Sequence, residues 1–263
     1  MARLITALTR LEAWIDATEV LLQSDSELNV ILSIDRPGSD GPMSKSATAI
    51  VDEFLRAEKS KPLHSVAETI FPAWEYRKRG FDGMSDTYAD VEYPQIKEGW
   101  GTYAYRMLRR RNGKGDVLNP LADLIAKMKD EASLPAPKSA CYELGIAEGA
   151  YDVPLYITTD DQTRRMGGPC LSHLSFKYAA GAVHLTALYR SHEYRYKTLG
   201  NLLGLARLQG CVAQEVGAAI GTLVVHSTYA WLAPSKVKGR GKPALAELLA
   251  RLRDLTDVQA VPA

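Results

Sequence analysis

Residues 168–215 decide the fold, and they read GPCLSHLSFKYAAGAVHLTALYRSHEYRYKTLGNLLGLARLQGCVAQE. Cys170 opens an apolar run typical of a strand, residues 179–181 form a turn, and a second strand ends at Arg190. Apolar residues then recur at helical spacing after Asn201. A thiol, a guanidinium and an amide therefore stand at the ends of elements. The scaffold fixes side chains at such places while leaving them accessible.

Composition narrows the class of protein. The chain has 263 residues, of which 46% are hydrophobic and 24% are charged, the balance of an ordinary globular protein. Its net charge of +1 gives no indication of nucleic acid or an acidic membrane as a partner, and we expect neither. No apolar run approaches the roughly 20 residues of a membrane span. Three cysteines suit a reducing compartment, so we expect a cytoplasmic protein with free thiols.

The order of elements favours a single α+β domain over residues 1–263. Helical spacing alternates irregularly with short apolar runs, and no internal repeat interrupts the chain. We expect helices at 8–23, from Ser44 or Ser46 to 57, at 63–71, 118–132 and 243–255. We expect strands at 29–34, 140–146, 153–158 and 222–230. Residues 75–99 are rich in charge, tyrosine and glycine, and we interpret them as an irregular surface segment.

Cys170 is the strongest candidate for a reactive group. A free cysteine is most often a small buried hydrophobe, and Cys211, between apolar residues of a helix, fits that description. Cys170 instead follows a Gly-Gly-Pro sequence at the start of a strand, where a thiol can face a cleft. A nearby cation such as Arg190 would favour the thiolate, which is the nucleophilic form.

Two other features have a functional and a structural interpretation. Arg190 and Ser191 offer a guanidinium fork and a hydroxyl to an anion, although a surface arginine without a role is about as frequent. Asn201 could cap a helix, or its amide could pair with a uracil face, because it offers both a donor and an acceptor. The remaining histidines of this region show no metal-ligand spacing and are interpreted as strand residues: His173, His184, His192 and His226.

Taken together and in this order, these motifs resemble the thymidylate synthase family. The Pro-Cys, Arg-Ser and Asn motifs follow the family's order and spacing, and Val-Ala-Gln-Glu at 212–215 continues the register. Upstream, Ser-Val-Ala-Glu at 65–68 resembles the helix with the family's catalytic glutamate. Gly-Thr-Tyr-Ala at 101–104 resembles the segment with its active-site tyrosine.

The resemblance implies a fold and a reaction. The fold would be a mixed six-stranded sheet with flanking helices, packed back-to-back in a homodimer. The reaction would be alkylation at C5 of a pyrimidine nucleotide or nucleoside, with 5,10-methylenetetrahydrofolate as the carbon donor. Cys170 would add to C6 of the ring, Glu68 would handle protons through water, and Tyr103 would help to remove the C5 proton.

The resemblance also assigns binding residues. Arg190, with Ser191, would bind phosphate, and Asn201 would read a uracil-type base. Arg36 would correspond to an early phosphate-binding arginine. Glu193 stands where the family has an aspartate that contacts folate.

The chain departs from the family around the sugar and the phosphate. Trp231 and Ala233 occupy the positions of a His-x-Tyr pair that holds the sugar hydroxyl. Ala140 and Cys141 stand nearest to a consecutive arginine pair that reaches across the dimer. Arg164 with Arg165, or the basic segment 236–242, are candidates to replace that pair.

Three functions therefore remain open. The first is an enzyme that methylates or hydroxymethylates C5 of a uracil-type nucleotide. The second is an enzyme that uses Cys170 without folate, for example on a modified base. The third is a homologue that binds nucleotide in a structural or regulatory role and has lost the chemistry.

Overall fold

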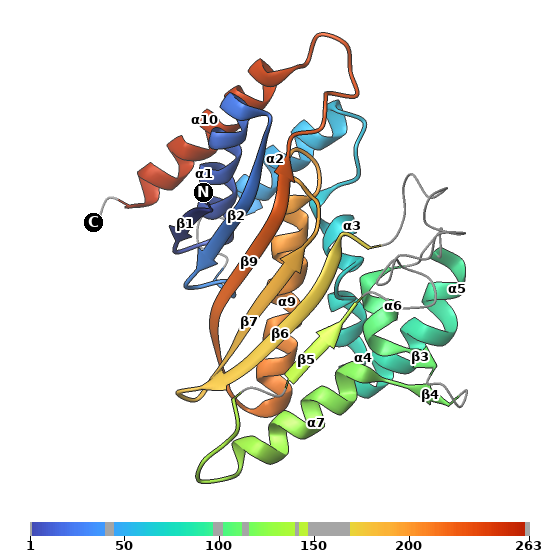
Figure 1. Cartoon of the computed structure of the whole chain (residues 1–263). Helices are drawn as coiled ribbons and strands as arrows, with labels where there is room; N and C mark the ends of the chain where they lie inside the picture. The colour runs from blue at the N-terminus through green and yellow to red at the C-terminus, as the bar shows by residue number, and fades with distance from the viewer. Residues whose placement is uncertain are drawn as a thin grey trace, which may run out of the picture.

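A mixed sheet forms the centre of the protein in the computed structural model, which describes residues 2–39, 45–96, 102–111, 116–139, 142–146 and 169–260 (Figure 1). Six strands lie side by side in the order β1 (Arg3–Ala7), β2 (Ser26–Ile34), β9 (Ala219–Trp231), β7 (Ala182–Tyr189), β6 (Leu171–Ala179) and β5 (Tyr142–Gly145). β1–β2 and β7–β9 are parallel, and the other neighbours in this path are antiparallel. The two-residue β8 (His192–Glu193) adds to the end of β9. The predicted mixed sheet is confirmed.

Helices pack behind this sheet in the view of Figure 1. The longest helix behind the central strands is α9, which runs from the upper to the lower end of the sheet. The helices are α1 (Arg10–Ser24), α2 (Lys45–Ala57), α3 (Leu63–Glu68), α4 (Ala73–Thr87), the π-helical η1 (Tyr88–Glu92), α5 (Tyr93–Ile96), α6 (Tyr103–Leu108), α7 (Pro120–Ala132), α9 (Thr198–Val216) and α10 (Lys242–Ala260). A small hairpin of β3 (Arg110–Arg111) and β4 (Val117–Leu118) lies beside α6.

The hairpin between β6 and β7 sets the register of the central sheet. Its two turn residues, Ala180 and Gly181, have φ values of 50° and 74°. Two positive φ values in a two-residue turn match the right-handed twist of the flanking strands. The register therefore places Leu171, the first residue of β6, opposite Tyr189, the last residue of β7.

Two glycines let α3 approach α9 closely. A Cβ on Gly200 would lie 2.7 Å from Cβ of Val66, and one on Gly204 would lie 2.7 Å from the carbonyl oxygen of Ala67. No side chain fits at these distances, so the two helices are held against each other backbone to backbone. This contact brings the end of α3 to the beginning of α9.

The sheet has one covered and one uncovered face. Alternate residues of β7, such as Val183 and Leu185, are buried under the helices. The residues between them, including His184 and Leu188, stay partly exposed, and no described helix lies in front of β9, β7 and β6 in Figure 1. One hydrophobic core thus fills the space between the sheet and its helices.

The structure differs from the expected elements in two places, and a third expectation is untested. β1 was not predicted, because a short edge strand with mostly exposed residues shows no clear alternation. Residues 75–99 were expected to be irregular, but α4, η1 and α5 make residues 73–96 helical, with a break at Gly80 (φ 70°). The predicted strand 153–158 lies outside the described residues. Within the described residues, no helix is long and apolar enough to cross a membrane.

Candidate active site

Cys170 and Arg190 meet where β6 begins and β7 ends. The backbone N–H of Arg190 donates to the carbonyl oxygen of Cys170 at 2.9 Å. The Nε of Arg190 donates to the carbonyl oxygen of Pro169 at 3.0 Å. Both residues remain accessible to solvent in part, so the strand ends fix a thiol and a guanidinium side by side.

Tyr103 reaches the same place from α6. Thr102 caps this helix by accepting a bond from the N–H of Tyr105, which fixes the direction of the first turn. The Tyr103 hydroxyl accepts a bond from the N–H of Leu171 at 3.4 Å. Burial, and secondly the nearby Cys170, raise the pKa of Tyr103 above its ordinary value. A neutral phenol therefore lies next to the thiol.

Asn201 lies inside α9 and does not cap it. The helix begins at Thr198, and the buried side chain of Asn201 bonds through Nδ2 to Nε2 of His192 at 3.1 Å. Nδ1 of His192 bonds in turn to Oγ of Ser227 at 2.9 Å. Burial lowers the pKa of His192 to about 3, so the ring is neutral at physiological pH. A buried relay therefore fixes the amide of Asn201, and the alternative of a helix cap is wrong.

The ring of His192 stacks on Tyr189, with centroids 3.9 Å apart and an angle of 4° between the planes. This stacking links Asn201 to the residue beside Cys170. Sequence reasoning missed both His192 and Tyr189. The available signal was their position in the Tyr-Arg-Ser-His run, on either side of the candidate anion site.

Ser191 is held by one of the residues that depart from the family pattern. The indole Nε1 of Trp231 donates to Oγ of Ser191 at 3.1 Å. Trp231 is the last residue of β9, and β8 pairs with that end of β9. Trp231 therefore has a structural role, because its indole N–H orients the Ser191 hydroxyl beside Arg190.

Glu193 is buried and binds backbone groups. Its carboxylate accepts bonds from the N–H groups of Arg195 at 2.6 Å, Tyr196 at 2.8 Å and Ala233 at 3.2 Å. Burial raises the pKa of Glu193 and outweighs these three bonds, which lower it. The carboxylate thus joins the turn after β8 to the segment after β9. A contact with folate stays a prediction.

Glu68 ends α3 and lies near the beginning of α6. The N–H of Ala104 donates to the carbonyl oxygen of Thr69 at 3.0 Å, so the ends of the two helices adjoin. The half-buried carboxylate pairs with Arg207 at 3.2 Å and with His64 at 3.5 Å. Burial raises the pKa of Glu68, against the opposing charges of His64 and Arg207. A carboxyl with a raised pKa suits proton transfer near neutral pH.

Arg36 is not brought to this site. Ile34, two residues before it, pairs with Leu223 of β9, and Leu223 pairs with Leu185 of β7. Cys170 lies at the other end of β7, beyond Tyr189. Within one chain, Arg36 therefore lies at the end of the sheet opposite to Cys170, and its predicted phosphate contact has no support there.

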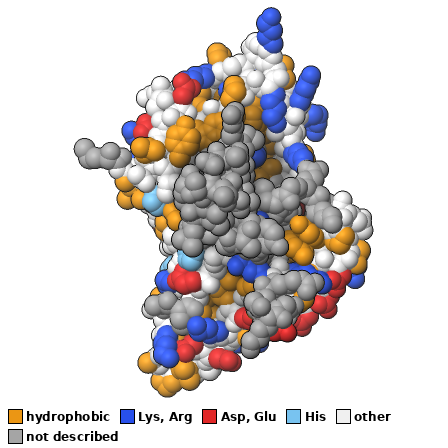
Figure 2. Space-filling model, turned by 45° about the vertical axis from the view of Figure 1, so that its right-hand side comes forward, with side chains coloured by type: hydrophobic (Ala, Val, Ile, Leu, Met, Phe, Trp, Pro, Cys, Tyr) orange, Lys and Arg blue, Asp and Glu red, His pale blue; other side chains and the backbone are white. Residues whose placement is uncertain are grey.

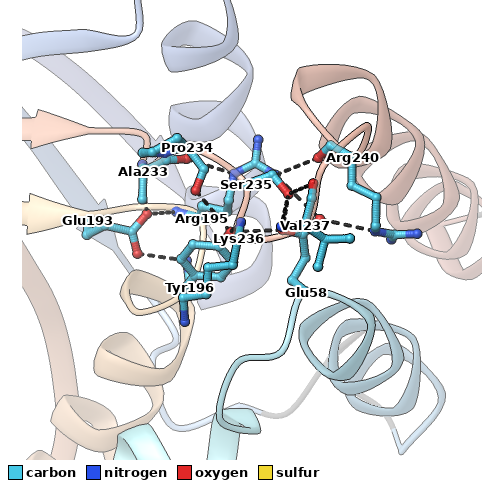
Figure 3. Close-up of polar contacts among 10 residues, drawn as sticks. All are labelled: Glu58, Glu193, Arg195, Tyr196, Ala233, Pro234, Ser235, Lys236, Val237 and Arg240. Atoms are coloured by element: carbon cyan, nitrogen blue, oxygen red, sulfur yellow. Dashed lines mark hydrogen bonds and ion pairs between the residues drawn. The ribbon is translucent and has the colours of Figure 1, made fainter.

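The basic segment 236–242 is anchored by acidic and polar partners (Figure 3). The buried carboxylate of Glu58 accepts bonds from Tyr196, Ser235 and Arg240, at 2.8, 2.6 and 3.1 Å. Lys236 bonds to Ser60 and lies over the ring of Tyr196, and Lys242 pairs with Asp25. Figure 2 shows Lys and Arg side chains at the upper end of the molecule, where Figure 1 draws this segment.

Three of the four cations in segment 236–242 bind partners within the protein that hold the segment in place. They are Lys236, Arg240 and Lys242. The other candidate replacements for the cross-subunit arginine pair, Arg164 and Arg165, lie outside the described residues, as do Ala140 and Cys141. Among the residues described, no group of three or more His, Cys, Asp or Glu side chains could hold a metal ion.

The relatives and the solved structure found by comparison with known proteins are all named as thymidylate synthases. No family model matches the chain. A protein named "Putative thymidylate synthase" from Methanothermobacter marburgensis is 41% identical over 59 residues, which are 22% of this chain and 26% of that protein. Proteins of the same name from Methanococcoides burtonii and Methanosarcina mazei are 42% identical over 62 residues and 28% identical over 153 residues. These matches cover 29% and 57% of the two relatives' own lengths.

The fold agrees with these names. The solved structure of thermostable thymidylate synthase A from Bacillus subtilis superposes with a TM-score of 0.51, covering 93% of this chain and 84% of that one at 11% identity. The local sequence matches and the shared fold together support a divergent thymidylate-synthase-like protein.

Proposed function

We propose that the protein transfers a one-carbon unit to C5 of a uracil-type pyrimidine nucleotide, as a methyl or hydroxymethyl group. One observation carries the proposal: Cys170, Arg190 and Tyr103, from β6, β7 and α6, converge on the backbone around Cys170 and Leu171. The two free thiols of the described residues, Cys170 and Cys211, agree with a reducing cytoplasm.

In this proposal the Cys170 thiolate forms a bond to C6 of the ring. The electrons of the C5–C6 double bond move toward C5 and the C4 carbonyl, so C5 becomes a carbon nucleophile. C5 would then bond to the one-carbon unit, and the C5 proton and the donor's nitrogen would leave to give an exocyclic methylene group. Hydride from the donor would complete a methyl group, or water a hydroxymethyl group, as the bond to sulfur breaks. Arg190, fixed beside the thiol, attracts the phosphate.

Two groups serve the proton transfers. Tyr103 is neutral because burial raises its pKa, so it passes protons by hydrogen bonding and does not act as a phenolate. Glu68, at the adjoining helix end, has a raised pKa and exchanges protons through water. Asn201, oriented by His192, pairs with the amide edge of the base.

Only the resemblance to the thymidylate synthase family suggests which molecule donates the one-carbon unit. A reduced folate, 5,10-methylenetetrahydrofolate, supplies a one-carbon unit at the oxidation level of formaldehyde when bound. The residue expected to contact it, Glu193, uses both carboxylate oxygens for backbone bonds. A carboxylate has about four acceptor positions, so a contact of Glu193 with folate stays a prediction.

We further propose a back-to-back homodimer through the uncovered face of the sheet. His226 of β9 stands there between Ile31 of β2 and Leu188 of β7, all partly exposed. Val224, two residues before His226 on the same strand, is also partly exposed. Sedimentation should give twice the chain mass, and Leu188→Lys should give monomers. A wild-type monomer at micromolar concentration contradicts the dimer.

A turnover assay tests the reaction. Deoxyuridine monophosphate labelled with tritium at C5 should release its label to water in the presence of 5,10-methylenetetrahydrofolate. Cys170→Ser should abolish the release, and Cys211→Ser, which changes a buried thiol of α9, should retain it. Product mass then separates methylation from hydroxymethylation. No release above the Cys170→Ser background would reject the proposal.

A second function is favoured by one observation. Trp231 replaces a sugar contact, and most of the basic segment 236–242 is committed to internal partners. A protein that binds nucleotide without turning it over fits this pattern. Calorimetric binding of deoxyuridine monophosphate, unchanged by Cys170→Ser and without tritium release, would favour that function.

A further inference from the structure

The hydroxyl of Tyr189 is fully buried and has no hydrogen-bond partner in the described structure. Folded proteins rarely leave a buried hydroxyl unpaired, because the group loses its bonds to water and gains none. Tyr194 is also fully buried, and its hydroxyl forms a hydrogen bond with Oγ of Ser227 at 3.2 Å. The hydroxyl of Tyr189 therefore lacks, among the described residues, the partner that a buried hydroxyl normally has.

The position of Tyr189 in the fold indicates where a hydrogen-bond partner would bind. Tyr189 is the last residue of β7 and lies opposite Leu171, whose N–H donates to the hydroxyl of Tyr103. The next residue, Arg190, donates its N–H to the carbonyl of Cys170. Two tyrosines thus flank the reactive thiol, one from α6 and one from β7. The resemblance to thymidylate synthases assigns Tyr103 to the active site, and Tyr189 is a second tyrosine at the same place.

The surroundings keep Tyr189 rigid and neutral. Its ring stacks on His192, which also holds the amide of Asn201. Burial, and secondly the neighbouring Tyr103 and Cys170, raise the pKa of Tyr189 well above its ordinary value. The hydroxyl is therefore a donor at every physiological pH, and it cannot swing away to find a partner elsewhere.

We propose that Tyr189 is a substrate-positioning residue whose hydroxyl donates a hydrogen bond to a carbonyl oxygen of the bound pyrimidine. This inference rests on the proposed function, since it places the base against Cys170. In the free protein this hydroxyl is closed to solvent and has no partner among the described residues. The bound base would therefore supply the acceptor oxygen that the described residues do not provide.

The test is Tyr189→Phe, which removes only the hydroxyl. The melting temperature of the free variant should equal or exceed that of the wild type, because no bond to the chain is lost. Its affinity for deoxyuridine monophosphate, measured by calorimetry, should fall about tenfold, as expected for one neutral hydrogen bond. The rate of adduct formation with 5-fluorodeoxyuridine monophosphate should fall with it.

Tyr76→Phe is the matched control. The Tyr76 hydroxyl donates to Glu215 at 2.7 Å, at the end of α9 away from Asn201. This variant should lose melting temperature and keep the nucleotide affinity of the wild type. The two variants should therefore show opposite patterns in stability and binding.

Two results would overturn the inference and leave the function intact. In one, the wild type forms the adduct and Tyr189→Phe binds nucleotide equally well. In the other, Tyr189→Phe loses as much melting temperature as Tyr76→Phe, which marks a structural bond in the free protein. If the wild type neither binds nucleotide nor forms an adduct, the proposed function fails first, and the inference fails with it.

Discussion

The amide of Asn201 and the imidazole of His192 are hydrogen-bonded at 3.1 Å inside the protein, between α9 and the strand end beside Arg190. His192 is neutral there, with a pKa of about 3. A neutral ring offers one donor and one acceptor, so its partner Ser227 and the Asn201 amide are oriented together. The amide of the proposed base reader is therefore oriented by a buried histidine.

His192 should make the protein less stable in acid. Its pKa is about 3 in the folded state and about 6.5 when unfolded, so only the unfolded chain takes up a proton between these values. Stability is full above about pH 6.5 and falls as the pH drops, by about 2 kcal/mol at pH 5. His192→Gln cannot titrate, so it should show a smaller loss between pH 7 and 5. Urea unfolding at both pH values measures this, and equal losses in both proteins would refute it.

Asn201→Asp should change the preferred base. A carboxylate accepts but does not donate, so it matches the amino group of cytosine and repels the O4 of uracil. It would also accept a bond from Nε2–H of His192 and favour the charged ring. Calorimetry should show weaker binding of deoxyuridine monophosphate and stronger binding of deoxycytidine monophosphate. An unchanged ratio of the two affinities would remove Asn201 from base reading.

Glu58→Gln should destabilise the segment after β9. Burial alone would raise the pKa of Glu58, but bonds from Ser235, Tyr196 and Arg240 and the charge of Arg195 together lower it. Its stabilisation is therefore present above pH 4.5 and is lost as the pH falls through the lowered value. Breaking this buried pairing should cost about 3–5 kcal/mol.

The control for Glu58→Gln is Glu53→Gln. Glu53 is exposed and pairs with Arg251 at 3.5 Å, so its loss should cost less than about 1 kcal/mol. Chemical unfolding at pH 7 compares the two variants. Similar losses in both would mean that the Glu58 network does not anchor the segment.

Gly204→Ala should separate α3 from α9. The new Cβ would lie 2.7 Å from the carbonyl oxygen of Ala67, which is backbone and cannot rotate away, so we expect a loss of about 1–3 kcal/mol. Because α3 carries Glu68, turnover should fall as well. Gly210→Ala, on the same helix, meets only Ile220 at 3.6 Å and should be neutral or stabilising by up to about 1 kcal/mol. If both variants behave alike, the close contact is unimportant.

Local patterns predicted the central part of the fold well. The hairpin around Gly181 and a helix at Asn201 follow from turn residues and apolar spacing. Both are confirmed, although the helix begins at Thr198 and not at Asn201. Cys170, Tyr103 and Arg190 were each singled out from the sequence, and the structure brings them together.

Contacts between distant strands were not predictable in the same way. Arg36 was assigned to the phosphate, yet the antiparallel pairing of β2 with β9 takes it to the other end of the sheet. The relay from Asn201 to His192 and Ser227 depends on the packing of three separate elements. No local pattern encodes such a relay, because each residue alone looks like an ordinary member of a strand or helix.

Covalent capture of a substrate analogue by Cys170 tests the central claim most directly. The protein should be incubated with 5-fluorodeoxyuridine monophosphate and 5,10-methylenetetrahydrofolate, and its intact mass and peptides measured. Fluorine at C5 cannot leave as a proton does, so the adduct should persist, and the added mass should map to Cys170. An unmodified Cys170, or an adduct that survives Cys170→Ser, would contradict the account.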